Sequence, residues 1–280
     1  MKKVDTLFSV CEKKDLLTWQ ITSRYVTNYI DSKKYVVIVP DSQVEEFRVC
    51  TPEKFDVVSE DLYLDNISAR LKQHIQPTGS SYNWYLQQFI KLAALYDVQD
   101  NELNLIWDAD TIPLKEINFS NGKSVNFYTG SENHKPYFET TRRLLGYGKI
   151  AEFSWIAQCF PCRGYWIKDF ISYIENKHSK NWVDSLIEAI DFPTFSSFSE
   201  YETLGTFIIR NYPEEITILN KDWLRYGNGI LGSPKNIGYF RRVLEPKYDY
   251  IAFENWDKKW SWYGQKIKKI LVNGRQRWRQ

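Results

Sequence analysis

The chain has 280 residues, of which 43% are hydrophobic and 26% charged, with only 13 Gly and 10 Pro. This composition excludes the disordered and fibrous classes and predicts a globular protein. No apolar run approaches the ~20 residues that a membrane helix needs, and the first residues do not lead into the apolar core of a secretory signal. We therefore expect a cytoplasmic protein, whose four cysteines are kept reduced.

Charge is distributed unevenly along the chain. Lys and Arg number 37 against 35 Asp and Glu, but residues 258–280 hold eight bases and no acid. Residues 1–257 therefore carry 29 bases and 35 acids, a net charge of −6. Trp and Ile alternate with the bases of the tail, a pattern typical of peripheral contact with an anionic membrane. A packed C-terminal helix with a solvated basic face is the alternative, and the acidic body argues against a nucleic-acid partner.

The first half of the chain alternates predicted strands and helices. Strands are expected at Asp5–Cys11, Tyr35–Pro40, Phe55–Ser59 and Asn104–Trp107, and helices at Lys14–Ile30, Gln43–Phe47 and Asn83–Tyr96. This order predicts an α/β fold with a mainly parallel central sheet flanked by helices. Ligands of such sheets bind beyond the carboxyl ends of the strands, so the chemistry is expected there.

The second half has a mixed pattern. A strand is expected at Val125–Tyr128 and helices at Pro136–Leu145 and Tyr165–Lys177, whereas Ser199–Arg210 fits a helix or a strand. Neither a repeat nor a low-complexity linker divides the chain. We predict a single domain over residues 1–257, followed by the basic aromatic tail 258–280.

The most informative segment is Leu103–Pro113, in which an apolar strand runs into Asp108-Ala109-Asp110. Residues i and i+2 of an extended segment face the same way, so the two carboxylates are expected to converge at the end of a strand. Paired carboxylate oxygens suit a hard divalent cation whose other ligands are phosphate and water. The alternative is an exposed turn with two solvated acids.

Two further blocks carry candidate site residues. Gln87 and Lys91 are four residues apart on one face of the Asn83–Tyr96 helix, from which they could reach a donor's diphosphate or sugar. The alternative for Lys91 is a side chain that extends to solvent. Glu200 and Glu202 lie within Phe198–Gly205, and either carboxylate is a candidate general base for an acceptor hydroxyl.

Taken together, the blocks Trp84–Leu92, Trp107–Thr111 and Ser199–Gly205 resemble the GT-A class of nucleotide-sugar glycosyltransferases. In particular, the chain is similar to a bacterial, mostly uncharacterised family that shares all three. The resemblance implies a Rossmann-like GT-A domain, with a nucleotide-binding half of about residues 1–112 and an acceptor half of about 113–257. It also implies Mn²⁺ or Mg²⁺ held by Asp108 and Asp110.

The same resemblance extends to the donor, the acceptor and the remaining ligands. The end of the first strand, including Ser9 and Glu12, would contact the nucleotide. GT-A enzymes often add a C-terminal His ligand, but no His follows His178, so water, Asn255 or Asp257 would complete the metal site. The implied reaction moves a sugar from a nucleotide-sugar donor to a glycan or lipid-linked acceptor hydroxyl in cell-envelope polysaccharide synthesis, with the enzyme peripheral at the inner membrane face. Five residues were considered for shaping the acceptor site, with ordinary core and surface roles as the alternative: Tyr137, Phe138, Arg142, Arg143 and Trp155.

Other functional classes also fit parts of the sequence. Asp108-Ala109-Asp110-Thr111 after a strand also resembles the opening motif of haloacid-dehalogenase-type phosphatases, although the later acidic pair of that family is missing from the sequence. A non-catalytic module that binds glycans or nucleotides is a second alternative. The pair Cys159 and Cys162 forms a lone C-x-x-C, for which a metal or redox role is a minor hypothesis.

Overall fold

The computed structural model describes residues 3–64, 66–75, 80–194 and 196–260. Five strands form the central sheet in the order β3-β2-β1-β4-β7. They are β1 (Val4–Val10), β2 (Ser32–Val39), β3 (Phe55–Ser59), β4 (Leu103–Trp107) and β7 (Cys159–Arg163). The first four run parallel, and β7 pairs antiparallel with β4. The predicted α/β fold with a mainly parallel sheet is confirmed.

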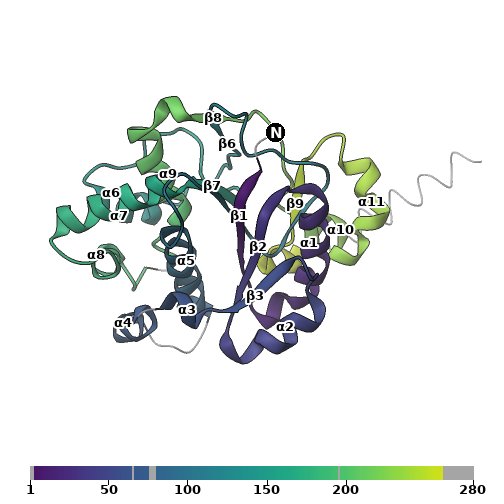
Figure 1. Cartoon of the computed structure of the whole chain (residues 1–280), viewed down its shortest axis with the longest axis horizontal. Coiled ribbons are helices and arrows are strands. Elements are labelled where there is room, and N and C mark those ends of the chain that lie inside the picture. Colours follow the sequence, from purple (N-terminus) through teal and green to yellow (C-terminus); the bar gives the residue numbers. More distant parts are fainter. Residues whose placement is uncertain (1–2, 65, 76–79, 195, 261–280) are drawn as a thin grey trace, which may run out of the picture.

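Helices lie on both sides of this sheet (Figure 1). One side holds α4 (Ile67–His74), α5 (Ser80–Tyr96), α6 (Lys135–Leu145), α7 (Gly164–His178), α8 (Trp182–Ala189) and α9 (Glu200–Asn211). The other side holds α1 (Leu16–Tyr29) and α2 (Val44–Cys50), and the short α3 (Asp61–Leu64) precedes α4. Successive strand residues alternate between two buried clusters: Phe8 and Val36 face α5, whereas Leu7 and Val37 face α1. Both faces of β1 and β2 are therefore buried, which explains their unbroken apolar runs.

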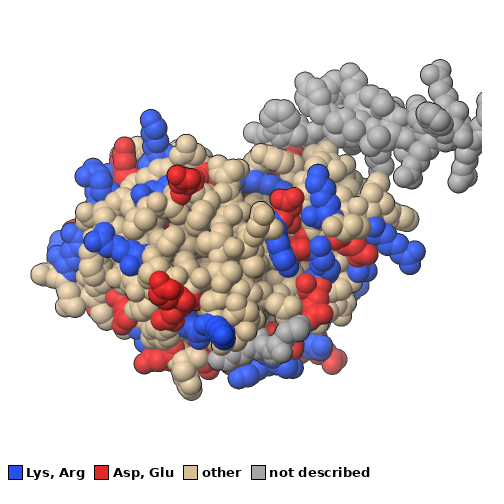
Figure 2. All heavy atoms as spheres, turned by 90° about the horizontal axis from the view of Figure 1, so that it is seen from above, with Lys and Arg blue, Asp and Glu red and all other residues tan. Residues whose placement is uncertain are grey.

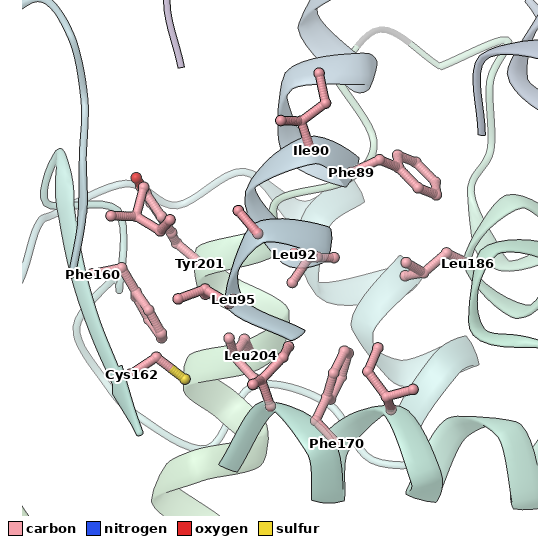
Figure 3. Close-up of a cluster of buried hydrophobic side chains, with 14 of the residues drawn as sticks. Phe89, Ile90, Leu92, Leu95, Phe160, Cys162, Phe170, Leu186, Tyr201 and Leu204 are labelled. Carbon is pink, nitrogen blue, oxygen red and sulfur yellow. The ribbon is translucent and has the colours of Figure 1, made fainter. Parts of the chain in front are cut away.

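Helix α5 is the centre of the larger cluster. Figure 3 shows Phe89, Ile90, Leu92 and Leu95 of α5 surrounded by side chains of β7, α7, α8 and α9. Because apolar groups surround α5, its polar side chains Gln88 and Lys91, which are also buried, need partners of their own. Those partners lie at the cleft described below.

The C-terminal part of the described chain folds back onto the sheet. Strand β5 (Thr111–Pro113) pairs antiparallel with β9 (Tyr250–Ala252), and β6 (Val125–Phe127) pairs parallel with β8 (Ile216–Ile218). Helices α10 (Gly227–Leu231) and α11 (Ile237–Leu244) pack in a third cluster with residues of β5 and β9. This arrangement brings residues beyond 220 next to the end of β4.

Strand β7 was not predicted, and it settles the cysteine hypothesis. Cys159 belongs to one buried cluster and Cys162 to the other, because residues three apart in a strand point to opposite faces. Burial raises the pKa of both thiols. The C-x-x-C is therefore part of the core and cannot act as a two-sulfur ligand or redox pair.

Two further findings complete the comparison with the predicted elements. Residues 200–211, left open between helix and strand, form α9, and the Ser199 hydroxyl accepts a hydrogen bond from the Glu202 amide at 3.3 Å, as an N-cap does. Among the described residues, no helix combines the length and apolarity needed to cross a bilayer. The predicted membrane-binding tail lies almost entirely outside the described residues.

Candidate active site

A cleft of about 690 Å³ opens at the carboxyl ends of β1 and β4. The chain moves from β1 outward through β2 to β3 and then returns to β4 on the opposite side of β1. The crevice between β1 and β4 is therefore the topological switch point, where open α/β sheets bind their ligands. The cleft is lined by the end of β1, α5, the β4–β5 turn, the residue before β7, α9 and the C-terminal segment. The lining residues include Val10, Gln88, Lys91, Asp108, Asp110, Gln158, Glu200, Arg225 and Glu254.

Asp108 and Asp110 form the floor of this cleft. They lie in a turn closed by the Thr111 amide, which donates to the Asp108 carbonyl oxygen at 3.0 Å. The extended geometry assumed from the sequence was wrong, but both side chains line the cleft. The Phe253 amide donates to the carbonyl oxygen of Asp110 at 2.9 Å, so the segment after β9 is fastened to this turn.

The other support of this turn is Gln158, the residue before β7. Its carbonyl oxygen accepts from the Asp108 amide at 2.9 Å, and its side-chain amide donates to Glu254 Oε1 at 3.1 Å. The backbone of Gln158 is left-handed, with φ of 61°, a conformation that costs energy in a residue other than Gly. Local strain of this kind is concentrated at functional sites.

A buried network joins Lys91 to α9. Its Nζ lies 2.7 Å from Asp108 Oδ1 and 2.9 Å from Glu200 Oε1. Nζ also donates to the Tyr201 hydroxyl at 3.1 Å, and that hydroxyl donates to Asp108 Oδ1 at 2.7 Å. Burial lowers the pKa of Lys91, but Asp108 and Glu200 outweigh this effect and raise it, so the side chain is an ammonium. Lys91 does not extend to solvent.

Core packing holds the two partners of Lys91 on α9. The Tyr201 ring stacks on Phe160 of β7 with centroids 5.3 Å apart, at the edge of the cluster in Figure 3. The Glu200 amide donates to Gln88 Oε1 at 3.1 Å. Burial raises the pKa of the Glu200 carboxyl, and Lys91 offsets part of that rise.

On the opposite side of the cleft, Arg225 holds the C-terminal segment. Its guanidinium donates to Glu254 Oε1 at 2.8 Å and forms an ion pair with Glu132. Trp256 donates its indole N–H to the other oxygen of Glu254. Gln158, Arg225 and Glu254 were not predicted as site residues, because no recognisable sequence motif surrounds them. Only the β5–β9 pairing brings Arg225 and Glu254 to the site.

The lining of the cleft is predominantly acidic. Six carboxylates line it (Asp15, Asp108, Asp110, Glu132, Glu200 and Glu254), against two cations, Lys91 and Arg225, among the described residues. Burial raises the pKa of Asp110 well above its usual range, and the charges of Glu254, Asp108 and Asp15 raise it further. The hydrogen bond from the Thr111 hydroxyl at 3.3 Å only partly offsets this.

These residues fit a divalent cation that takes its remaining ligands from a substrate. Asp108 Oδ1 is engaged by Lys91 and Tyr201, so its other oxygen and the Asp110 carboxylate are the candidate ligands. No group of three His, Cys, Asp or Glu side chains that could hold a metal occurs within the described ranges. A protein contribution of two carboxylates is usual for Mg²⁺ bound together with phosphates.

Apart from Gln87, the remaining predicted ligand residues are not themselves part of the cleft lining. Ser9 is buried and donates to the carbonyl oxygen of Trp107 at 2.7 Å, and Glu12 accepts from Gln87 Nε2 at 3.5 Å beside the cleft wall that Gln87 lines. Asn255 donates to Asp15. Asp257 accepts from the Gly229 amide at 2.9 Å, away from the cleft lining.

Glu202 occupies a different position from Glu200. Its Oε1 accepts from the Ser154 hydroxyl and from the Trp155 amide at 3.1 Å, and the side chain is not among those that line the cleft. Of the residues considered for the acceptor site, Tyr137 lines the cleft, where its ring lies parallel to that of Trp84 with centroids 6.3 Å apart. The other four do not line it: Phe138, Arg142, Arg143 and Trp155.

Comparison with known proteins places the chain in a family. The model of a family of unknown function, DUF6492, matches residues 2–217, and the chain belongs to this family. No curated protein matches the sequence.

Among solved structures, mouse xyloside xylosyltransferase 1 in its apo form is similar, with 13% identity, a TM-score of 0.51 and coverage of 90% of this chain and 98% of that one. The glycosyltransferase GlyE of Streptococcus pneumoniae shares 12% identity, covering 92% of this chain and 56% of that chain. The galactosyltransferase LgtC with donor and acceptor sugar analogues shares 9%, covering 89% and 86%. The TM-score is 0.43 for each of these two structures. The likeness to the xylosyltransferase shows that the fold is of the GT-A type.

Proposed function

We propose that the protein is a glycosyltransferase that uses a nucleotide-sugar donor and Mn²⁺ or Mg²⁺. The observation that carries the proposal is the pair Asp108 and Asp110 on the floor of an acidic cleft at the switch point of the sheet. A diphosphate is itself negatively charged, and a lining with six carboxylates and two cations would repel it. Donor binding in this cleft therefore requires a cation that Asp108 and Asp110 would hold.

Within this proposal, the residues of the chain have distinct roles. A bound cation would neutralise the charge of the leaving nucleoside diphosphate. Lys91 keeps the Asp108 carboxylate oriented through the contact at 2.7 Å and adds a positive charge beside the donor site. Tyr201, whose pKa burial and the neighbouring Asp108 and Glu200 raise, stays protonated and donates to the same oxygen. Gln87 and Glu12 border the donor side of the cleft.

We assign the general-base role to Glu200. Its side chain lines the cleft, whereas that of Glu202 does not. Burial raises the pKa of Glu200 above its ordinary value, although Lys91 offsets part of the rise, and a more basic carboxylate is better suited to accept a proton from an acceptor hydroxyl. The acceptor is proposed to be a glycan or lipid-linked sugar of the cell envelope, modified by a cytoplasmic enzyme at the inner membrane face.

A thermal-shift screen of nucleotide sugars, with and without Mn²⁺, tests the proposal. A donor that binds only the folded state raises the melting temperature by mass action, and we expect this rise only when metal is present. Asp110→Ala should abolish this rise in melting temperature. The control is Asp56→Ala, which removes an exposed carboxylate on the edge strand β3 and should leave the rise intact. A donor-induced rise that is equal without metal would contradict the proposal. Turnover of para-nitrophenyl phosphate without a nucleotide sugar would favour the phosphatase alternative instead.

A further inference from the structure

Helix α11 presents an apolar and basic face to solvent. Tyr239 is 83% exposed and Val243 67% exposed. They are four residues apart, so they share one face of the helix, together with the exposed Arg242. Phe240 and Leu244, which pack against the third cluster, and the buried Ile237 form the opposite face.

Exposed apolar side chains are concentrated in this part of the molecule. Five of the twelve large apolar side chains that are exposed in the described ranges lie within residues 226–256: Tyr226, Ile230, Tyr239, Val243 and Trp256. Isolated exposed apolar residues are normal, but a concentration of them marks an interaction surface. Two of these five side chains, Tyr226 and Trp256, also line the cleft.

The same segment is a basic island on an acidic body. Residues 227–248 contain four bases (Lys235, Arg241, Arg242 and Lys247) and one acid, Glu245, which forms an ion pair with Arg241 at 2.7 Å. The rest of residues 1–257 then carries 25 bases and 34 acids. Figure 2 shows Lys and Arg interspersed with Asp and Glu over the face seen from above.

The position of the last described residues adds a second argument. Two hydrogen bonds join residues 254–257 to α10. The Asn228 side chain donates to the Glu254 carbonyl oxygen at 3.0 Å, and the Gly229 amide donates to the Asp257 carboxylate. The eight bases of residues 258–280 follow directly. The tail and this face therefore carry the same sign of charge, and both would be attracted to an anionic surface.

We propose that the outer face of α10–α11, with Tyr239, Arg242 and Val243 at its centre, docks on an anionic lipid bilayer. Aromatic and aliphatic side chains enter the headgroup region while Arg and Lys bind the anionic headgroups, each base contributing about 1 kcal/mol. The proposal is independent of the reaction catalysed in the cleft.

A site-specific fluorescent label on the full chain tests this face without interference from the tail. Tyr239→Cys, made in a Cys50→Ser background, would carry an environment-sensitive dye; the other three cysteines are buried. The matched control is Val49→Cys on α2 in the same background, since Val49 is 90% exposed and α2 lies apart from α11 in Figure 1. Vesicles would contain equal parts of phosphatidylglycerol and phosphatidylcholine, with pure phosphatidylcholine as the neutral arm.

We expect a blue shift of the dye at position 239 with anionic vesicles, none at position 49, and loss of the shift in pure phosphatidylcholine or at high salt. Arg242→Ser together with Val243→Ser should weaken vesicle binding about tenfold or more, because one base and one apolar side chain that would enter the headgroup region are lost. The proposal is overturned if the protein pellets with anionic vesicles while the dye at 239 does not respond, because the tail alone would then dock. Absence of any vesicle binding, or a shift given by RNA and not by vesicles, overturns it equally.

Discussion

The Nζ atom of Lys91 lies 2.7 Å from Oδ1 of Asp108, which makes the central helix of the core and the floor of the cleft a single electrostatic unit. Glu200 completes this unit at 2.9 Å from the same ammonium. All three side chains are largely removed from solvent, so loss of the single cation, Lys91, would leave two carboxylates without their partner.

Replacing Lys91 with Met should therefore destabilise the protein strongly. Loss of one partner from a buried ion pair typically costs about 3–5 kcal/mol, and here two carboxylates lose their cation. The free energy of unfolding from urea denaturation measures the effect. Adding Glu200→Gln to Lys91→Met should recover part of the loss, because one of the two unpaired charges is then removed. The matched control is Lys168→Met, because the ion pair of Lys168 with the exposed Asp100 should contribute about 1 kcal/mol or less. Equal losses of unfolding free energy in the two variants would contradict the buried network.

Asp110→Asn should raise the stability of the metal-free protein. Its carboxyl pKa is raised by burial and by Glu254, Asp108 and Asp15, so the ionised form is disfavoured in the folded state and a neutral isostere relieves the repulsion. The same substitution should remove the stabilisation by Mn²⁺ and donor. Calorimetric melting with and without metal checks both effects. A metal-free Asp110→Asn protein that melts below the wild type would show that the carboxylate is compensated.

Acidification should weaken metal binding before it weakens the fold. Because the folded-state pKa of Asp110 is raised, the carboxylate takes up a proton while other carboxylates are still ionised, and that proton competes with the cation. The apparent affinity for Mn²⁺ in the presence of a nucleoside diphosphate should therefore fall as the pH drops from neutral toward the ordinary carboxyl pKa. Titration calorimetry at a series of pH values measures it, and an affinity that is constant over this range would be inconsistent with ligation by Asp110.

Glu200→Gln and Glu202→Gln should separate catalysis from structure. Loss of a general base lowers kcat about 10²–10⁴-fold, so Glu200→Gln should retain donor binding but lose transfer. Glu202→Gln keeps the oxygen that accepts from Ser154 and Trp155, and kcat should stay within about threefold of wild type. Steady-state kinetics with a donor found in the thermal-shift screen distinguish the two. A larger loss of kcat in Glu202→Gln than in Glu200→Gln would reverse the assignment.

Two helical glycines predict opposite effects of an added methyl group. At Gly205 of α9, a Cβ would lie 2.4 Å from ring atoms of Trp155, so Gly205→Ala should destabilise the protein by about 1–3 kcal/mol through overpacking. At Gly238 of α11, no atom lies within 4 Å of the added Cβ, so Gly238→Ala should stabilise by about 0.5–1 kcal/mol. Thermal unfolding of both variants measures the difference, and a stable Gly205→Ala protein would show that α9 can shift away from Trp155.

The sequence was most informative where local pattern and tertiary environment agree. The apolar run at Tyr35–Pro40 reads as a strand buried on both faces and is one, and the helix formers of Asn83–Tyr96 lie within α5. Strand β7 was not predicted, because CFPCR contains Pro and lacks an alternation of apolar and polar residues. The Pro is tolerated because β7 is an edge strand that pairs only with β4.

The candidate site was predictable only where its residues follow a recognisable block. Asp108 and Asp110 end an apolar strand, and Lys91 lies on the strongest predicted helix. The pairing of Lys91 with Glu200, 109 positions apart in the numbering, depends on how α9 packs on α5 and has no local signal. The same is true of Glu254, which reaches Asp110 only because β9 pairs with β5.

The pairing of β5 with β9 also joins the part of the chain that the family model matches to a part that lies beyond it. The matched family region ends at residue 217, yet Arg225, Tyr226, Glu254 and Trp256 supply one wall of the cleft. The acidic floor of the cleft and its outer wall are thus separate stretches of chain joined by the short β5–β9 ladder. The acidic floor therefore lies inside the region that the family model matches, whereas this wall lies beyond it.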